Sequence, residues 1–272
     1  MYKKTAGLIL ILALGTAAGT ANAASLSEGR WVADGVYRGL NFRGLTGLFI
    51  TDSAYTIGKN NFAISGGYAS ESVAGNTINA VPVSITYGYG AAAEISISGS
   101  AINSTAASGI GDSSLSWKWR FRRQSEYLPA MAMGAAVIAP GTNAAISTVS
   151  TYGVRLNGMA SSEAALTETG YIGLYVDVQL DAIDPGSSSS DYYYSANAGG
   201  ELPLSDDKRL QLIGEVNYTT SHAASVDNYT GYTGGLRYTS RIFQYSLAGS
   251  LRSRGDGSNT SQAMFNLTIP FF

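Results

Sequence analysis

The sequence predicts an all-β protein: a closed antiparallel transmembrane β-barrel of about 12 strands, with 10 or 14 as the alternative counts. Three observations predict it. They are an N-terminal export signal, a composition poor in charge, and a series of alternating, turn-bounded segments from residue 61 to residue 272. The alternation is decisive because successive side chains of a strand point to opposite faces, so every spanning strand places lipid-facing and lumen-facing residues in turn.

Residues 1–23 have the three parts of a secretion signal. Lys3 and Lys4 form the charged region, residues 8–14 form the apolar region, and Ala21-Asn22-Ala23 is a small-residue cleavage site. The apolar run is shorter than the roughly 20 residues that a membrane-spanning helix needs. We therefore expect a signal peptide that is cleaved after Ala23, and a mature protein in the outer membrane of a Gram-negative bacterium.

The composition suits a wall that contacts lipid. Only 13 % of the residues are charged, against about 25 % in an ordinary globular chain, and the chain contains 33 Gly and 18 Tyr. A charge on the lipid face costs about 2–4 kcal/mol at mid-depth, and tyrosines favour the two membrane interfaces. Loss of Lys3 and Lys4 with the signal changes the net charge from −2 to −4, which gives no reason to expect a nucleic-acid partner. Without cysteine, neither disulfides nor a thiolate metal site can form.

The spanning segments differ in how clearly they alternate. Residues 114–122, 171–181 and 210–218 do so clearly; in the first, Leu115, Trp117, Trp119 and Phe121 oppose Ser116, Lys118, Arg120 and Arg122. Weaker alternation is found in residues 61–70, 78–87, 92–101, 149–158, 191–201, 229–239, 242–252 and 261–271. Residues 128–138 have no clear polar face and are assigned as a strand by their spacing alone.

The connections test the same assignment, because barrels of this class alternate short periplasmic turns with longer external loops. The predicted external loops, rich in Gly, Ser, Asn and Asp, are residues 102–111, 139–148, 182–190, 220–228 and 253–260. The predicted periplasmic turns are residues 88–91, 123–127, 202–207 and 240–241. The link 159–168 is long for a periplasmic turn and fits the alternation least well. An even strand number puts both chain ends in the periplasm.

The C-terminus resembles the assembly signal of outer-membrane barrels, which end in an aromatic residue. We assign that signal to Phe271 and Phe272. The alternating apolar set that ends at Phe271 is one position out of step with Phe272. Either Phe272 lies beyond the last strand, or Pro270 marks a bulge, which a residue without an N–H tolerates at a strand end.

Residues 24–60 precede the regular pattern and contain Arg30, Arg38 and Arg43. They admit three interpretations: a periplasmic leader, an additional strand, or a segment folded into the lumen. The third would change the function, because a plugged barrel does not conduct as an open one does.

Residues Gly109-Ile110-Gly111-Asp112, followed by Trp117-Lys118-Trp119-Arg120-Phe121, resemble a glycine-aspartate-strand segment of one barrel family. This is the family of outer-membrane barrels associated with phenol meta-pathway operons. The resemblance implies roughly twelve strands and the passage of small or hydrophobic solutes. It covers one short stretch and assigns no functional residue.

The side chains available argue against catalysis. The single histidine, His222, lies in a predicted external loop beside Ser221, whose side chain would point away from it in an extended segment. No catalytic residue, cofactor or metal site is therefore expected, and the chain is not expected to be an enzyme. Asp181 and Asp184 could contact calcium, but the Asp-Pro-Gly sequence at residue 184 is more simply explained as a turn.

The alternation also predicts which charges line the lumen: Glu94, Lys118, Arg120, Arg155, Asp177, Glu215, Arg237 and Arg252. Such charges must be hydrated or paired. Their mixed signs argue against strong selectivity for one ionic charge. We expect a narrow passive pore or small-solute transporter; the alternative is a closed structural or surface-interaction barrel that binds through its external loops. Expected partners are outer-membrane lipid and lipopolysaccharide, the barrel-assembly machinery and small solutes.

Overall fold

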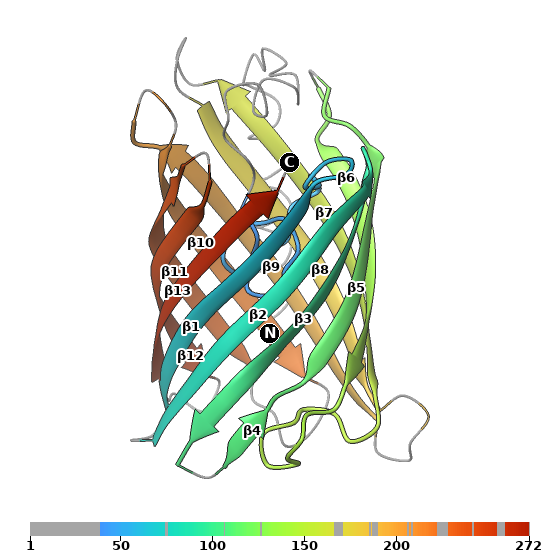
Figure 1. Ribbon diagram of the computed structural model, residues 1–272, viewed down its shortest axis with the longest axis vertical. Coiled ribbons are helices and arrows are strands. Elements are labelled where there is room, and N and C mark those ends of the chain that lie inside the picture. Colours follow the sequence, from blue (N-terminus) through green and yellow to red (C-terminus); the bar gives the residue numbers. More distant parts are fainter. Residues whose placement is uncertain are drawn as a thin grey trace, which may run out of the picture.

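The computed structural model describes residues 39–271 except 74–75, 106, 126, 166–170, 185, 187–189, 206, 208, 222–227, 241 and 255–258. The predicted signal peptide, His222 and Phe272 lie outside the described residues. Within the described part of the chain, no helix is long and apolar enough to cross a membrane. Figure 1 shows a single barrel whose strands are strongly tilted against its long axis.

The strands of the barrel are all antiparallel to their neighbours. They are β1 (Phe62–Val73), β2 (Asn76–Gly90), β3 (Ala93–Ser104), β4 (Ser108–Ile110), β5 (Ser113–Arg122), β6 (Ala130–Ala139), β7 (Gly153–Ala165), β8 (Tyr171–Ile183), β9 (Asp191–Pro203), β10 (Leu210–Ser221), β11 (Tyr229–Thr239), β12 (Gln244–Arg254) and β13 (Asn259–Phe271). Strand β2 pairs with both β1 and β3, and β1 pairs with β13, so the sheet closes. Because β4 and β5 both pair with β3, they form one interrupted wall strand. The predicted count of twelve is confirmed.

Several strand limits are shifted by a few residues, and two predicted segments differ more strongly from the observed strands. Strand β7 begins and ends later than the predicted segment 149–158, and residues 153–165 pair throughout with the clearly alternating strand β8. The prediction of a long link at residues 159–168 was therefore wrong. Most of the predicted loop 102–111 is also strand, because β3 continues to Ser104 and pairs with β4. Backbone pairing extends both strands where Ser, Ala and Gly leave little alternation to read.

Both ends of the barrel wall meet at one edge of the molecule. Phe62 of β1 pairs with Phe271 of β13, and Ala63 pairs with Pro270 without a register shift. The bulge at Pro270 is therefore absent, and β13 is regular to its end. We call this edge the periplasmic end, because chain ends and short turns of such barrels lie there. Residues 140–152, which join β6 to β7, lie at the opposite, external end.

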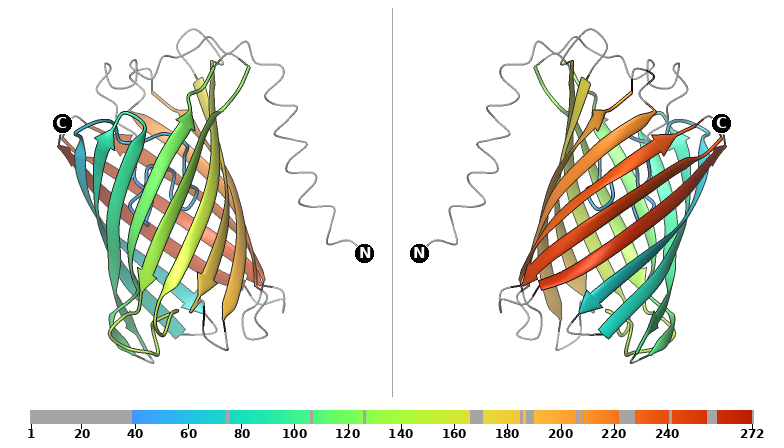
Figure 2. Two further views of the ribbon diagram at one scale, coloured as in Figure 1. Left: turned by 90° about the vertical axis from the view of Figure 1, so that its right-hand side faces the viewer. Right: turned by 90° about the vertical axis from the view of Figure 1, so that its left-hand side faces the viewer.

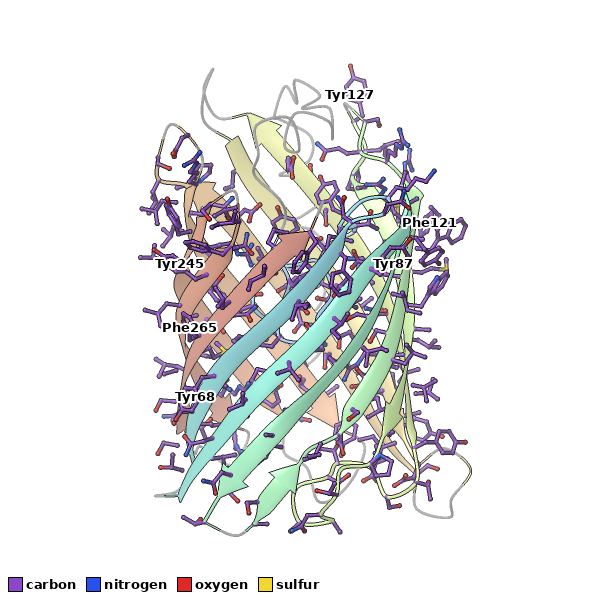
Figure 3. All side chains as sticks on the ribbon, in the orientation of Figure 1. Tyr68, Tyr87, Phe121, Tyr127, Tyr245 and Phe265 are labelled. Carbon is purple, nitrogen blue, oxygen red and sulfur yellow. The ribbon has the colours of Figure 1, made fainter. Side chains whose placement is uncertain are left out.

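The outer wall is apolar, as the alternation predicts. On β5, Leu115, Trp117, Trp119 and Phe121 are exposed, whereas Ser116, Lys118 and Arg120 are buried. Aromatic side chains point outward near the periplasmic end, among them Tyr87 and Phe121, and aliphatic side chains cover the middle of the wall (Figure 3). Tyr192, Tyr194, Tyr218 and Tyr232 are exposed nearer the external end. This is the surface of a barrel that crosses a bilayer.

Residues 39–58, here called the inserted segment, lie inside the barrel, where both views of Figure 2 show them enclosed by the strands. Their apolar side chains Leu48, Phe49, Ala54 and Tyr55 are buried in a cluster with inward residues of the wall. Its hydrogen-bonded bridges join Leu40 to Thr46 and Gly47 to Asp52. Of the three interpretations of residues 24–60, a segment folded into the lumen therefore describes residues 39–58.

The inserted segment explains why residues 128–138 lack a polar face. The inward positions of β6 include Ala130, Ala132 and Gly134, and the two alanines pack in the same cluster as Ala54 and Tyr55. Small side chains at these positions leave space for the segment. An alternation between apolar and polar residues is absent here because the lumen side of β6 faces protein and not water.

Candidate functional site

All eight predicted lumen charges lie on wall strands, and they fall into two groups. Toward the middle and periplasmic half are six buried residues: Glu94 on β3, Lys118 and Arg120 on β5, Asp177 on β8, Glu215 on β10 and Arg237 on β11. Arg155 on β7 and Arg252 on β12 are partly exposed and line a cavity near the external end. In the first group, Glu94, Lys118, Asp177, Glu215 and Arg237 bind the inserted segment.

Glu94 and Lys118 form a fully buried ion pair that holds two parts of the inserted segment. Glu94 Oε1 lies 2.7 Å from Lys118 Nζ, and both side chains are 0 % exposed. The carboxylate accepts the N–H groups of Thr46 at 2.9 Å and Ile57 at 2.8 Å. Lys118 donates to the carbonyl oxygens of Thr46 and Ser53. These bonds satisfy both charges, as burial requires.

Asp177 and Asp52 meet near the middle of the lumen. The Asp177 carboxylate accepts the backbone N–H of Asp52 at 2.7 Å and the amide of Asn197 at 2.8 Å. The Asp52 carboxylate accepts hydrogen bonds from Asn41 and Asn157 and lies 3.4 Å from the guanidinium of Arg43. Arg43 of the inserted segment therefore places a cation next to the site where Asp52 and Asp177 approach each other.

Glu215 and Arg237 bind the backbone of residues 47–51 in the inserted segment. Glu215 accepts the N–H groups of Ile50, at 3.1 Å, and Thr51, at 2.8 Å. Arg237 donates to the carbonyl oxygens of Gly47 and Leu48 at 3.0 and 3.1 Å. The buried carboxylate of Glu215 and the buried guanidinium of Arg237 thus take the place of the water that these peptide groups would otherwise bind. At the periplasmic end, Arg120 donates to the carbonyl of Ala91.

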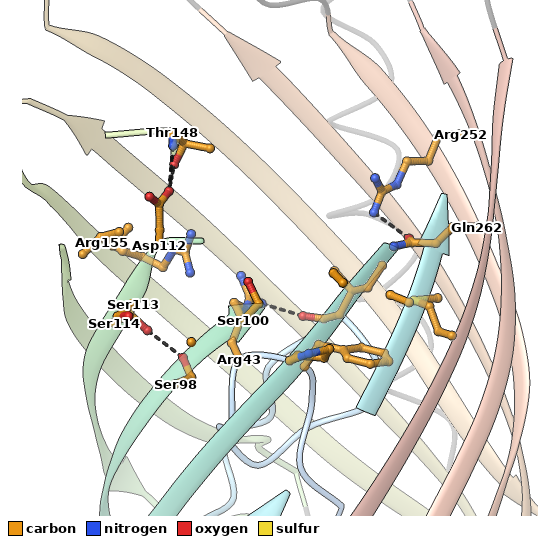
Figure 4. A pocket seen from close by; sticks show the side chains of 18 residues that line it. Arg43, Ser98, Ser100, Asp112, Ser113, Ser114, Thr148, Arg155, Arg252 and Gln262 are labelled. Carbon is orange, nitrogen blue, oxygen red and sulfur yellow. Dashed lines mark hydrogen bonds between the residues drawn. The ribbon is translucent and has the colours of Figure 1, made fainter. Parts of the chain in front are cut away.

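The external half of the lumen contains an open cavity of about 360 Å³, here called the outer cavity (Figure 4). Phe42, Arg43 and Ile50 of the inserted segment line it, so the segment forms its floor. The walls come from strands on opposite sides of the barrel, including β1, β2, β5, β7 and β12. The outer cavity therefore ends where the inserted segment begins.

The wall arginines of the outer cavity are paired with carboxylates. Arg155 binds Asp181 through two hydrogen bonds of 2.7 Å, and these two residues are direct neighbours in the β7–β8 ladder. Arg252 reaches across β13, lies 3.2 Å from Glu71 on β1, and also donates to Gln262. Each of these wall cations has a compensating anion in the wall.

Two aspartates fix the loop 140–152 at the external end. Asp112 accepts the N–H groups of Gly141, at 3.1 Å, and Thr148, at 2.8 Å. Asp184 accepts the N–H groups of Ser150 and Thr151, and these bonds hold the pKa of its carboxyl well below the usual range. Its backbone has a φ of 50°, which Asp and Asn tolerate better than other non-glycine residues. The loop is thereby tied to β5 and β8.

Sequence reasoning missed Asp52 and the acids that pair with the wall arginines, Asp181, Glu71 and Glu201. Glu201 lies 3.4 Å from Arg237. Asp181 shares the inward face of Asp177, so the alternation could have identified it; Glu71 lay one residue beyond the predicted strand 61–70. No sequence signal places Asp52 against β8. Within the described residues, no group of three or more His, Cys, Asp or Glu is arranged to hold a metal ion.

The geometry is that of solved outer-membrane barrels. An outer membrane channel from Pseudomonas putida F1 matches with a TM-score of 0.58 at 13 % identity, over 80 % of this chain and 98 % of that one. The NanC porin matches with 0.57 at 10 % identity, over 76 % and 98 %, and the KdgM porin with 0.50 at 11 %, over 76 % and 99 %. The chain shares their fold. No protein-family model and no curated protein sequence matches it.

Proposed function

We propose that this chain is a narrow passive channel of the bacterial outer membrane for small solutes, and that the inserted segment sets the width of the path. The observation that supports it best is the outer cavity, which opens in the external half of the barrel and ends on Phe42, Arg43 and Ile50. An open cavity with polar and charged lining residues, enclosed by a wall that is apolar outside, can admit solutes from the external side. Barrels of this size lie between forms filled by side chains and open porins.

The structural neighbours support the same proposal by analogy of fold. They are an outer membrane channel, the NanC porin and the KdgM porin. A fold can carry unrelated functions, so the weight rests on the lumen of this chain. The resemblance of residues 109–121 to the barrels of phenol meta-pathway operons is consistent with a channel for small solutes, and membership of that family remains part of the proposal.

A second candidate is a closed structural or surface-interaction barrel. The number of buried groups that bind the inserted segment favours it, because Glu94, Lys118, Asp177, Glu215 and Arg237 all hold its backbone. In that case the external loops would be the working surface. Both candidates include export by a cleaved signal peptide, contact with outer-membrane lipid and lipopolysaccharide, and insertion by the barrel-assembly machinery; neither involves catalysis, a cofactor or nucleic acid.

Single-channel recording separates the candidates. In a planar bilayer, we expect a small steady current from the full-length protein and a larger one from a variant that lacks residues 40–57, because the segment occupies part of the lumen. Circular dichroism of both proteins should show the same β-rich spectrum. A full-length protein that is folded but silent at all voltages would contradict the passive channel and favour the closed barrel.

A point variant keeps this test decisive if the shortened chain does not fold. Glu215→Leu leaves the N–H groups of Ile50 and Thr51 without their acceptor, a loss of about 1–3 kcal/mol for a buried donor. The segment should loosen and the current should rise. Leu212→Ala on the lipid side of the same strand is the matched control and should leave the current unchanged.

A further inference from the structure

The outer cavity has two chemically different sides. On one side, neighbouring strands β13, β1 and β2 contribute Met264, Ala69 and Pro82, and these residues continue into Phe42 and Ile50 on the floor. Phe42 and Ile50 also pack against the buried cluster that contains Met264 and Ala69. This side is a continuous apolar surface, on which an apolar face of a solute could rest.

The adjoining side carries hydroxyl groups. Strands β3 and β5 contribute the inward-facing Ser98, Ser100 and Ser114 to the lining. The hydroxyls of Ser98 and Ser114 lie 2.8 Å apart and form a hydrogen bond (Figure 4). A serine hydroxyl has one donor and two acceptor sites, so this pair can still bond to a solute.

The three arginines that line the outer cavity are compensated by carboxylates. Arg43, Arg155 and Arg252 lie 3.4, 2.7 and 3.2 Å from Asp52, Asp181 and Glu71 respectively. Asp112 is different: its carboxylate accepts hydrogen bonds from the loop 140–152, which occupy its oxygens but do not cancel its charge. Selectivity for anions or cations needs a lining of one sign. Here an anionic solute would lose hydration without gaining an unpaired cation, and a cationic solute would meet only Asp112, whose oxygens are already hydrogen-bonded.

The volume limits the size of the solute. Liquid water occupies about 30 Å³ per molecule, so the cavity of about 360 Å³ has room for about twelve waters or a similar number of non-hydrogen atoms. This corresponds to one small ring with its substituents.

We propose that the outer cavity binds small uncharged solutes that carry hydroxyl groups along one edge and an apolar face, of at most the size of a monosaccharide. The hydroxyls bond to the serines of β3 and β5, and the apolar face rests on Phe42, Ile50 and the wall formed by β13, β1 and β2. Passage of the solute rests on the proposed function as a channel, whereas binding in the cavity does not.

Liposome swelling with three probes of nearly equal size tests the selectivity. Glucose is uncharged, glucosamine is a cation and glucuronate is an anion. We expect glucose to enter roughly tenfold faster than either ion, because desolvating an unpaired charge costs more than the 1.4 kcal/mol to which tenfold corresponds. Equal rates, or faster entry of either ion, would overturn the proposal.

Reversal potentials in a salt gradient test the compensated charges. Arg252→Gln leaves Glu71 unpaired and should shift the selectivity toward cations, and Glu71→Gln should shift it toward anions. The double variant restores the charge balance, so its reversal potential should return close to that of the wild type. Arg209→Gln in the periplasmic turn, outside the cavity, is the control for a general charge effect. Strong ion selectivity of the wild type would contradict the compensation.

Binding separates this inference from the proposed function. Saturation-transfer NMR on the detergent-solubilised protein should show contact with glucose, reduced in the variant Ser98→Ala/Ser114→Ala. Binding without any swelling or current would support the cavity and contradict the channel. A conducting protein that neither binds glucose nor prefers it to glucuronate would leave the channel standing and overturn the inference.

Discussion

Carboxylates act as fixed hydrogen-bond acceptors in two regions of this barrel. Inside it, Glu94, Asp177 and Glu215 accept backbone N–H groups of the inserted segment. At the external end, Asp112 and Asp184 accept N–H groups of the loop 140–152. Bonds to an ionised acceptor are roughly twice as strong as those between neutral groups, so a few residues can order a segment that has little regular structure of its own.

Asp184 provides a test at the scale of one residue. Its pKa is lowered by the N–H groups of Thr151 and Ser150, so its contribution is present above the pKa of an unfolded Asp, about 3.9, and is lost only as the pH falls through the lower folded value. Asp184→Asn, which tolerates the φ of 50°, should therefore speed amide exchange of Ser150 and Thr151 several-fold at neutral pH. Asp207→Asn at the periplasmic end is the control; equal exchange in all three proteins would contradict the role of the charge.

At the scale of elements, the inserted segment is ordered by the wall and not by its own propensity. Its bridges, Leu40–Thr46 and Gly47–Asp52, are isolated, and its turns need positive φ at Gly44 and Gly58. The wall in turn has glycines where the segment approaches it. A side chain at Gly88 would meet the backbone of Gly58, and one at Gly199 would meet Leu48. Segment and wall are therefore complementary in shape as well as in charge.

Gly88→Ala tests this fit. The added Cβ would lie 1.7 Å from the carbonyl oxygen of Gly58, so the backbone must move at the point where the segment leaves the lumen. We expect a loss of about 1–3 kcal/mol in stability, the usual cost of overpacking, measured by urea unfolding in vesicles, together with a changed single-channel current. Gly90→Ala on the same strand meets nothing within 4 Å and should have little effect. Similar losses in both variants would show that the segment does not constrain Gly88.

At the scale of the whole molecule, the wall separates an apolar exterior from a polar interior. Inward positions of the wall hold the buried Glu, Lys, Arg, Asn and Gln residues, and outward positions hold exposed Leu, Ile, Val and aromatic side chains. Such an arrangement is stable only when the outside contacts hydrocarbon, because so large an exposed apolar surface would aggregate in water. Closure of the sheet removes the edges that would otherwise carry unpaired backbone groups in the bilayer.

A charge on the exterior tests the membrane placement. Val83, near the middle of β2, is 54 % exposed and pairs with Gly66 and Gly99. Val83→Arg should destabilise the barrel in lipid vesicles by about 2–4 kcal/mol, the cost of a cation at mid-depth. Tyr89→Arg, near the periplasmic end of the same strand, should cost about 0–1 kcal/mol, as expected at an interface. Equal effects of the two substitutions on urea unfolding would place Val83 outside the hydrocarbon.

The class of fold and most strand positions follow from the sequence alone, because the lipid and the lumen impose a period of two on the side chains of each strand. Strand β11 has the predicted limits 229–239, and all eight predicted lumen charges lie on wall strands. The period of two is not visible on β6 and around residues 102–111, because small residues there face protein or neighbouring strands.

The contents of the lumen follow only from the three-dimensional fold. Residues 39–58 have no period, and their position depends on bonds to Glu94, Asp177, Glu215 and Arg237, which are distant in sequence. The same holds for the pairing of Arg252 with Glu71 across β13, and hence for the charge balance of the outer cavity. Local patterns record the environment of each face, whereas partners inside a closed barrel are set by the three-dimensional course of the chain.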